Sequence, residues 1–189
     1  GYDGDYLGPE RSQVDNALAS LDKFDQLPIK TKVKTSSPLA SSEIGRKPKE
    51  SMAWGKSEIL VRASMEQVLA FMWHFDSRAR RKENDLEKTI VETKSLHHVI
   101  ACVCKKGTKG LLKLLPRESI NSNVWKRMGD NSIVVAGTPT THDNRGITKE
   151  RVRISVPFVI NIEKQSDESC KFTYCQSLGM GELVPNAIL

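Results

Sequence analysis

The sequence predicts an α+β fold in which a curved antiparallel sheet lies around a helix and encloses a cavity. After residue 51 a short strand and a helix come first, and from Asp85 onward the pattern is β throughout. Turn signals such as Lys106-Gly107 and Gly129-Asp130-Asn131 separate the strands, and strands joined by short turns pair antiparallel. The concave face of such a sheet must be filled by large side chains or enclose a space, and aromatic residues make up only 6% of this chain.

Residues 1–50 are predicted to be a flexible linker or N-terminal extension. They are rich in turn-forming and charged residues, and their eight basic and eight acidic residues cancel. Val14, Leu18 and Leu21 have helical spacing, which indicates one short amphipathic helix with a narrow apolar stripe that docks loosely. Residues 51–189 are predicted to form the folded domain.

The first helix of that domain has a clear start signal. Ser64 and Gln67 have the spacing of a capping box, in which each side chain binds a free backbone N–H of the first turn. Val68, Met72 and Phe75 follow at helical spacing, so we expect them to face the sheet.

A series of strands follows the helix. Their expected ranges are 86–95, 97–105, 119–128, 131–138, 149–156, 158–164 and 170–178. In strand 119–128, one register points Asn121, Asn123 and Trp125 into the concave face, whereas a shift of one residue turns them to solvent. The pattern alone leaves both registers open.

The charge and the cysteines indicate the environment of the domain. The net charge of +6 arises entirely from residues 51–189, which predicts an anionic membrane surface or nucleic acid as partner. Cys102 and Cys104 share one face of a strand, and a metal site would need His97 and His98 as further ligands. That spacing matches no familiar zinc pattern, so we expect no metal and read the cysteines as small apolar strand residues.

Several segments together resemble the START (StAR-related lipid-transfer) domain, over about residues 53–189. Each motif is weak by itself, but their order and spacing agree with that family. The segments are Trp54-Gly55-Lys56 and Ser64–Ala70 at the opening, Pro116-Arg117-Glu118-Ser119 in the place of "PRDF", Ile133–Gly137, Arg151-Val152-Arg153 in the place of "VRA", and Leu178–Pro185 in the place of "DxxGxxP".

The chain also departs from the family pattern. Asn84-Asp85 replaces the usual "WD", and Asn123 stands where some members place a cavity arginine. Gln176 or Ser177 replaces the Asp before the final Gly. Only four residues follow Pro185, so residues 51–189 are expected to be a START-like lipid-binding domain lacking its closing C-terminal helix.

The resemblance implies a helix-grip fold that binds a lipid or sterol in a hydrophobic cavity, for transfer or sensing, without catalysis or a cofactor. The residues expected to bind the ligand are Glu92, Asn121, Asn123, Trp125 and Arg153. The residues expected to form a gate loop are His142, Asn144, Arg145 and Ile147, although the same loop also reads as a plain polar hairpin. We expect a cytoplasmic protein that can also lie peripherally on anionic membranes.

We consider three other functions beside lipid binding. A helix-grip enzyme would need one of the four histidines as base, but no Ser–His–Asp or paired-carboxylate spacing supports it. Nucleic-acid binding could use the basic run 78–82, which lacks interleaved aromatic residues, so no nucleic acid is expected. A regulatory or protein-interaction module of a larger protein is compatible with lipid binding.

Overall fold

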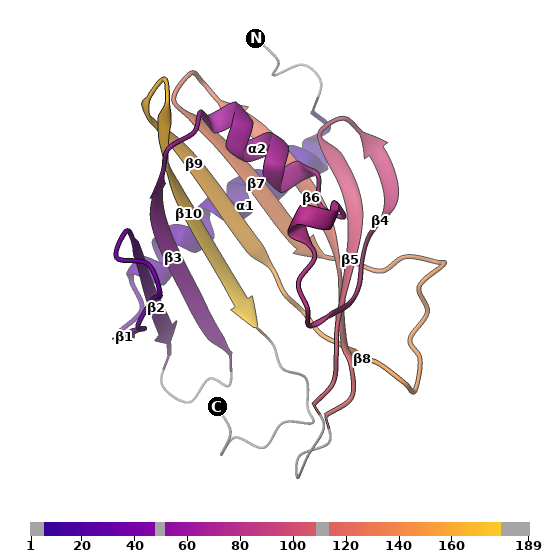
Figure 1. Cartoon of the computed structure of the whole chain (residues 1–189). Helices are drawn as coiled ribbons and strands as arrows, with labels where there is room; N and C mark the ends of the chain where they lie inside the picture. Colours follow the sequence, from indigo (N-terminus) through magenta and orange to yellow (C-terminus); the bar gives the residue numbers. More distant parts are fainter. Residues whose placement is uncertain (1–5, 48–51, 109–113, 179–189) are drawn as a thin grey trace.

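The computed structural model describes residues 6–47, 52–108 and 114–178. They form an α+β fold with one large sheet, as the sequence predicts (Figure 1). The helical elements are α1 (Gly8–Asp25), α2 (Met65–Trp73) and the 3-10 turn η2 (Arg78–Arg80). The strands are β1 (Ile29–Lys32), β2 (Ala40–Arg46), β3 (Ala53–Val61), β4 (Asp85–Ser95), β5 (His98–Lys105), β6 (Arg117–Met128), β7 (Ser132–Pro139), β8 (Val152–Arg153), β9 (Phe158–Ser166) and β10 (Ser169–Leu178).

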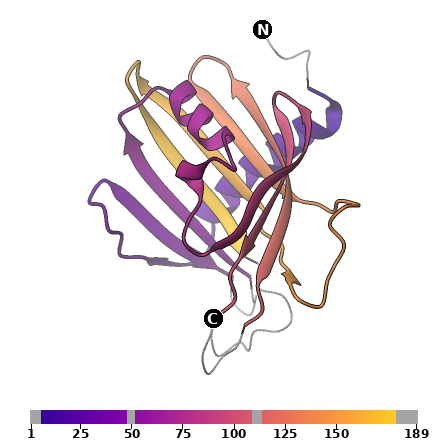
Figure 2. The same ribbon diagram turned by 45° about the vertical axis from the view of Figure 1, so that its right-hand side comes forward.

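Strands far apart in the sequence meet at the centre of the sheet. The order is β1-β2-β3-β10-β9-β7-β6-β5-β4, so β10 joins the early strands to the late ones. These neighbours pair antiparallel, and β8 pairs parallel with the start of β6. Helix α1 lies behind the sheet and α2 in front of it, and β4 and β5 curl forward on the α2 side (Figures 1 and 2).

The prediction of a flexible linker is wrong for the described part of residues 1–50. Helix α1 packs on the sheet with Val14 and Phe24 buried, and β2 pairs with β3 along its whole length. Gly45 of β2 allows a close approach, because a Cβ there would lie 2.6 Å from Leu27 Cδ1. Part of the contact is polar: the Gln13 side-chain amide donates to the carbonyls of Ser122 (2.7 Å) and Ala136 (3.0 Å). The prediction from the narrow apolar stripe therefore underestimated how firmly α1 is attached to the sheet.

Helix α2 begins where the capping box predicts. The Gln67 N–H donates to Ser64 Oγ (3.3 Å), and the Ser64 N–H donates to Gln67 Oε1 (3.0 Å). Val68 is buried and Met72 packs against the same apolar cluster. The helix ends at Trp73, so Phe75 lies in the connection to η2 rather than on the predicted helix face.

The predicted strands after Asp85 are confirmed, with one exception. Segment 149–156 contains only the two-residue strand β8. Next to it, the Val156 carbonyl accepts a hydrogen bond from Asn121 Nδ2 (2.8 Å). The Asn121 side chain thus binds a backbone carbonyl of this segment that a neighbouring strand would otherwise bind. The predicted absence of a closing helix concerns residues 179–189, which lie outside the described residues.

Candidate functional site

The sheet has two faces, which we name after the helix that each one carries. On the α1 face, Val14 and Phe24 of α1 pack against Val124 of β6 and Val159 of β9. On the α2 face, the apolar cluster contains Met65, Val68, Ile133, Val135, Ile160, Ile162 and Cys170. Because successive residues of a strand point to opposite faces, each strand contributes to both surfaces.

Burial alternates along β10 and shows that the two faces are not equally covered. Thr173, Cys175 and Ser177 face α1 and are at most 4% exposed. Phe172 and Tyr174, on the α2 face, are only half-buried. Helix α2 has nine residues, and it leaves part of this face uncovered.

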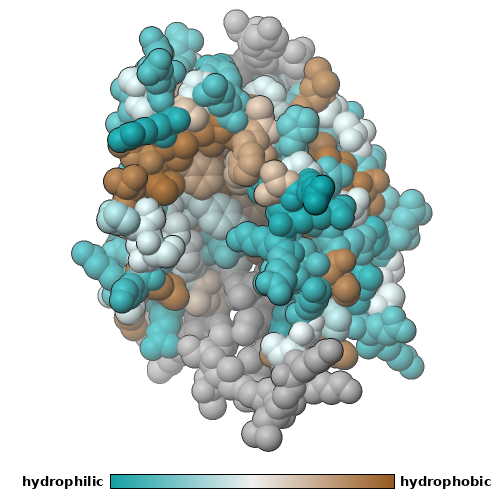
Figure 3. All heavy atoms as spheres, in the orientation of Figure 1, coloured by the Kyte–Doolittle hydropathy of each residue, from teal (hydrophilic) through white to brown (hydrophobic). Residues whose placement is uncertain are grey.

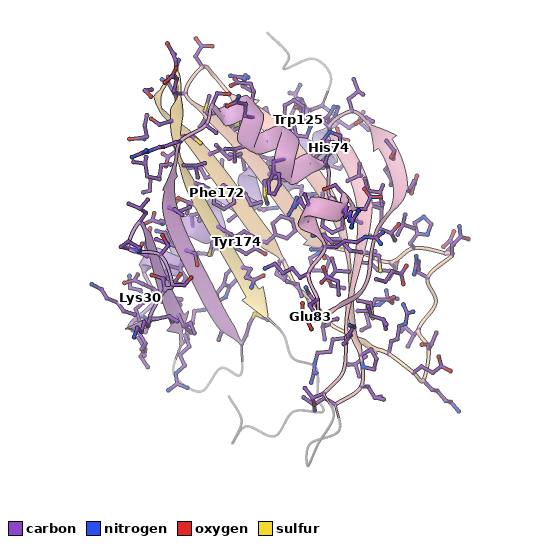
Figure 4. The ribbon with its side chains drawn as sticks, in the orientation of Figure 1. Lys30, His74, Glu83, Trp125, Phe172 and Tyr174 are labelled. Atoms are coloured by element: carbon purple, nitrogen blue, oxygen red, sulfur yellow. The ribbon has the colours of Figure 1, made fainter. Side chains whose placement is uncertain are left out.

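Aromatic side chains line the α2 face. Trp125, Phe172 and Tyr174 lie on the side of the sheet that carries α2 (Figure 4). The rings of Phe158 and Tyr174 have centroids 5.9 Å apart. Gly137 makes room for this pair, because a Cβ there would lie 2.0 Å from Phe158 Cε1. The result is an apolar, aromatic wall.

Two buried asparagines interrupt this wall. Asn121 and Asn123 have the same alternation as Trp125 on β6 and therefore lie on the α2 face. They are 7% and 5% exposed, and the Oδ1 atom of each has no hydrogen-bond partner. A buried polar atom left without a partner costs about 1–3 kcal/mol. Both oxygens are free to accept a hydrogen bond from a bound molecule or from water.

Two cations also lie at this side of the molecule. Lys88 of β4 is 9% exposed, and its ammonium donates to the Arg80 carbonyl of η2 (2.9 Å). The Phe75 ring centroid is 4.8 Å from Lys88 Nζ, and the Arg80 guanidinium lies 5.6 Å from the Phe71 ring centroid. Burial, together with the positive charge of Arg80, lowers the pKa of Lys88 to about 8.

The surface of the α2 side is hollowed between β3 and β10 on one side and η2 and β4 on the other, and apolar side chains gather beside α2 (Figure 3). A cavity of about 450 Å³ lies before the start of β4, lined by Lys82, Glu83, Asn84 and Lys106. The Lys106 ammonium donates to the Glu83 carbonyl (2.8 Å). Two basic side chains, one acidic side chain and one amide therefore line this cavity.

The structure separates Glu92 and Arg153 from the three predicted residues of β6. The β4–β5 register shifts between Ile90 and Glu92, which places Glu92 opposite Ile100, on the α1 face. Arg153 donates to Glu118 (2.9 Å). Glu118 is three residues from Asn121 along β6 and therefore points to the opposite face, the α1 face. The β-bulge beside Glu92 explains why this side chain lies on the α1 face, because the extra residue reverses the alternation of the two faces along the strand.

The predicted gate loop is tied to this same outer side. His142 Nε2 lies 3.5 Å from Glu92 Oε2, and Asn144 N–H donates to His142 Nδ1 (3.3 Å). Arg145 forms an ion pair with Glu87, and the hydrogen bond between them lowers the pKa of that carboxyl. Ile147 is 84% exposed. The gate role of this loop stays a prediction.

Arginine–carboxylate pairs extend this network. Arg151 Nη1 lies 2.9 Å from Glu87 Oε2 and 2.9 Å from Glu118 Oε2, so one guanidinium bridges two carboxylates. Glu118 also pairs with Arg153. Arg153 belongs to β8, and Arg145 and Arg151 precede it, so ion pairs anchor segment 140–157 to β4 and β6.

A second polar cluster joins α1 to the sheet. His98 Nδ1 lies 2.6 Å from Glu10 Oε1, His98 Nε2 lies 2.8 Å from Ser122 Oγ, and His97 Nε2 lies 3.2 Å from Glu10 Oε2. Burial raises the pKa of Glu10, but hydrogen bonds from the Leu7 N–H and both histidines outweigh it, so the pKa lies below its ordinary value. The sequence offered only the His97-His98 pair as a signal, since Glu10 and Ser122 are distant in the chain.

The cysteines and the acidic residues offer little reactive chemistry. Cys102, Cys104, Cys170 and Cys175 are free and buried, and burial raises the pKa of Cys102 and of Cys175 to about 12. Among the described residues, no group of three or more His, Cys, Asp or Glu side chains is placed to hold a metal ion. None of the helices in that part of the chain has the length and apolar character that crossing a bilayer requires.

Solved structures share this architecture. No protein-family model matches the sequence, and no curated protein matches it. Human STARD10 superposes with a TM-score of 0.74 at 12% identity, covering 92% of this chain and 70% of its own. Human StAR-related lipid transfer protein 5 gives a TM-score of 0.73 at 13% identity, with 97% and 88% covered. The STAR-related lipid transfer protein of Xanthomonas axonopodis gives 0.68 at 11% identity, with 84% and 86% covered. The order of strands and helices and these likenesses agree that the chain has a START-like, helix-grip fold.

Proposed function

We propose that this chain binds a lipid or sterol in the hollow of its α2 face, for lipid transfer or sensing, without catalysing a reaction. The observation that carries the proposal is the pair of buried amide oxygens on Asn121 and Asn123, which lack partners within an otherwise aromatic wall. The START-like fold supports it, because human StAR-related lipid transfer protein 5 is named for lipid transfer.

The apolar side chains and the asparagine oxygens would bind different parts of the ligand. The apolar body of a lipid would displace water from Trp125, Phe158 and Phe172, which contributes about 25 cal/mol per Å² of apolar area buried. A hydroxyl group of the ligand would donate to Asn123 Oδ1 and remove the cost of leaving that atom without a partner. A few polar groups that orient an apolar ligand are typical of such sites.

The enzyme alternative has one geometric argument in its favour. Ser122, His98 and Glu10 have the connectivity of a nucleophile, a base and an orienting carboxylate. However, Ser122 Oγ also donates to Gln13 Oε1 (3.2 Å), and α1 lies over this part of the sheet. The cluster therefore serves better as an attachment of α1 than as a site for a substrate.

Asn123→Leu tests the proposal directly. Native mass spectrometry of co-purifying lipids identifies the ligand class, and cholesterol with its hydroxyl-free counterpart cholestane forms the first matched pair of probes. We expect Asn123→Leu to weaken cholesterol binding by about 1–3 kcal/mol and to leave cholestane nearly unchanged.

Asn161→Leu is the matched control. Asn161 Oδ1 also lacks a partner, but Asn161 lies opposite Thr173 and Val134, on the α1 face. This variant should leave both affinities unchanged. The proposal fails if neither sterol binds and no lipid co-purifies, or if both variants weaken binding equally.

The proposed partner outside the hollow is an anionic membrane surface, which fits a cytoplasmic protein with a net charge of +6. Vesicles that contain anionic lipid should bind the protein, and neutral vesicles should bind it much less. Binding should fade as the Debye length shortens from about 8 Å at 0.15 M salt to about 3 Å at 1 M. Equal sedimentation with both kinds of vesicle would refute this docking, and salt-sensitive binding to duplex DNA alone would favour nucleic acid.

A further inference from the structure

We propose that the lipid bound by this chain carries an anionic group, a carboxylate or a phosphate, and that Lys88 binds this group inside the α2 face. The inference rests on the proposed function and deepens it, since the fold and the asparagines leave the charge of the ligand open. Three features of Lys88 carry it: its face, its lack of an acidic partner and the charges around it.

Lys88 belongs to the same face of the sheet as the two asparagines. It lies opposite Val103 of β5, which in turn lies opposite Ser119 of β6. Ser119 alternates in step with Asn121 and Asn123 along β6. Residues opposite one another in adjacent strands point to the same side, so Lys88 points to the side that α2 and η2 occupy.

Lys88 is buried without an acidic partner. Its ammonium has one hydrogen bond, to the Arg80 carbonyl, and lies over the Phe75 ring, 4.8 Å from its centroid, so its other N–H groups still lack a hydrogen-bond acceptor. Among the described residues, no carboxylate forms an ion pair with Lys88 or with Arg80. The nearby acid Asp85 is already paired with Lys105. A buried, unpaired cation is costly, and a bound anion offsets that cost.

The charges around Lys88 are mostly positive. Besides burial, the positive charges of Arg80, Lys105 and Lys82 lower the pKa of Lys88, whereas the negative charge of Asp85 raises it. Lys82 and Lys106 also line the cavity of about 450 Å³ that lies before the start of β4. An anionic headgroup at Lys88 would therefore lie among more positive than negative charge.

A purely structural role is the competing explanation, because the bond from Lys88 to Arg80 O also joins η2 to β4. The two roles differ in one measurable respect. A structural lysine changes stability but does not discriminate ligands by charge. A lysine that receives an anion prefers charged ligands over neutral ligands of the same shape.

The test compares three ligands with one acyl chain: oleate, oleoyl lysophosphatidic acid and oleyl alcohol. We expect the protein to bind at least one of the two anions about tenfold or more tightly than the alcohol, as charge-assisted hydrogen bonds require. Preference for oleate alone assigns a carboxylate, and preference for the lysophosphatidic acid alone assigns a phosphate. Lys88→Met should reduce the preference to about threefold or less while leaving alcohol binding in place.

Lys94→Met is the matched control, because Lys94 lies on the same strand but is exposed. It should keep the full preference. A pH series on the unmodified protein needs no variant: oleate affinity should fall between pH 7 and pH 9.5 as Lys88 loses its proton, and oleyl alcohol affinity should stay constant.

Two outcomes separate this inference from the proposed function. If the alcohol binds as tightly as both anions and pH has no effect, the anion site is refuted while lipid binding stands. If none of the three ligands binds, neither sterol binds and no lipid co-purifies, lipid binding itself is refuted.

Discussion

The α1 face and the α2 face of the same sheet are built on different principles. On the α1 face, aliphatic side chains are completely buried, and Gln13 of α1 donates to the carbonyls of Ser122 and Ala136 across a long sequence distance, although Asn161 and Ser177 on this face also keep buried oxygens without partners. On the α2 face, aromatic side chains are half-buried, and Asn121 and Asn123 keep amide oxygens without partners. The first face resembles a finished protein core, and the second resembles the wall of a site that a ligand completes.

Under the proposed function, one sheet would provide both stability and binding. Along β10, the residues that hold the fold and those that would meet a ligand alternate one by one, as Cys175 and Tyr174 do. A change on one face should therefore leave the other largely intact. Additivity of this kind is expected for side chains that share no partners.

The strongest test of the comparison is a matched pair of phenylalanines. Phe24→Ala on the α1 face removes a side chain that is 1% exposed, and it should lower the free energy of unfolding by about 3–5 kcal/mol. Phe172→Ala on the α2 face removes a half-buried ring, so the loss should be about 1–2 kcal/mol. Urea denaturation measures both. Equal losses would mean that the α2 face contributes to the core as much as the α1 face does.

Glu10 provides a smaller, pH-dependent test. Because its pKa is lower in the folded protein than its ordinary value, its contribution to stability is present above the ordinary pKa and is lost as the pH falls through the folded value. Glu10→Gln should lower the free energy of unfolding at pH 7 by about 1–3 kcal/mol. It should also flatten the acid side of the stability profile. An unchanged profile would show that the histidine cluster does not hold α1.

Much of the sheet could be predicted from local pattern, and the reasons for the exceptions are physical. Turn residues and alternation fixed β4 to β7 within a residue or two, and the capping box fixed the start of α2. Helix α1 was underestimated because its attachment depends on Gln13 and Glu10, whose partners are about 90 to 120 residues away. No local pattern reports contacts at that distance.

The site was predictable only in part. The alternation of β6 allowed two registers, and the structure selects the one that turns Asn121, Asn123 and Trp125 toward α2. Glu92 could not be placed, because the bulge beside it reverses the face without any glycine or proline to mark it. Lys88 was missed because a lysine in a strand usually faces solvent.

Because Arg151 bridges two carboxylates, its ion pairs would set how often segment 140–157 detaches from the sheet. Its guanidinium holds Glu87 and Glu118 together, and Arg145 and Arg153 each hold one of them. Because the four ion pairs share Arg151, Glu87 and Glu118, we expect the loss of one to weaken the others, so that the segment detaches as one unit rather than residue by residue. Raised ionic strength would make such events more frequent, and a slow exchange step would then become faster in salt.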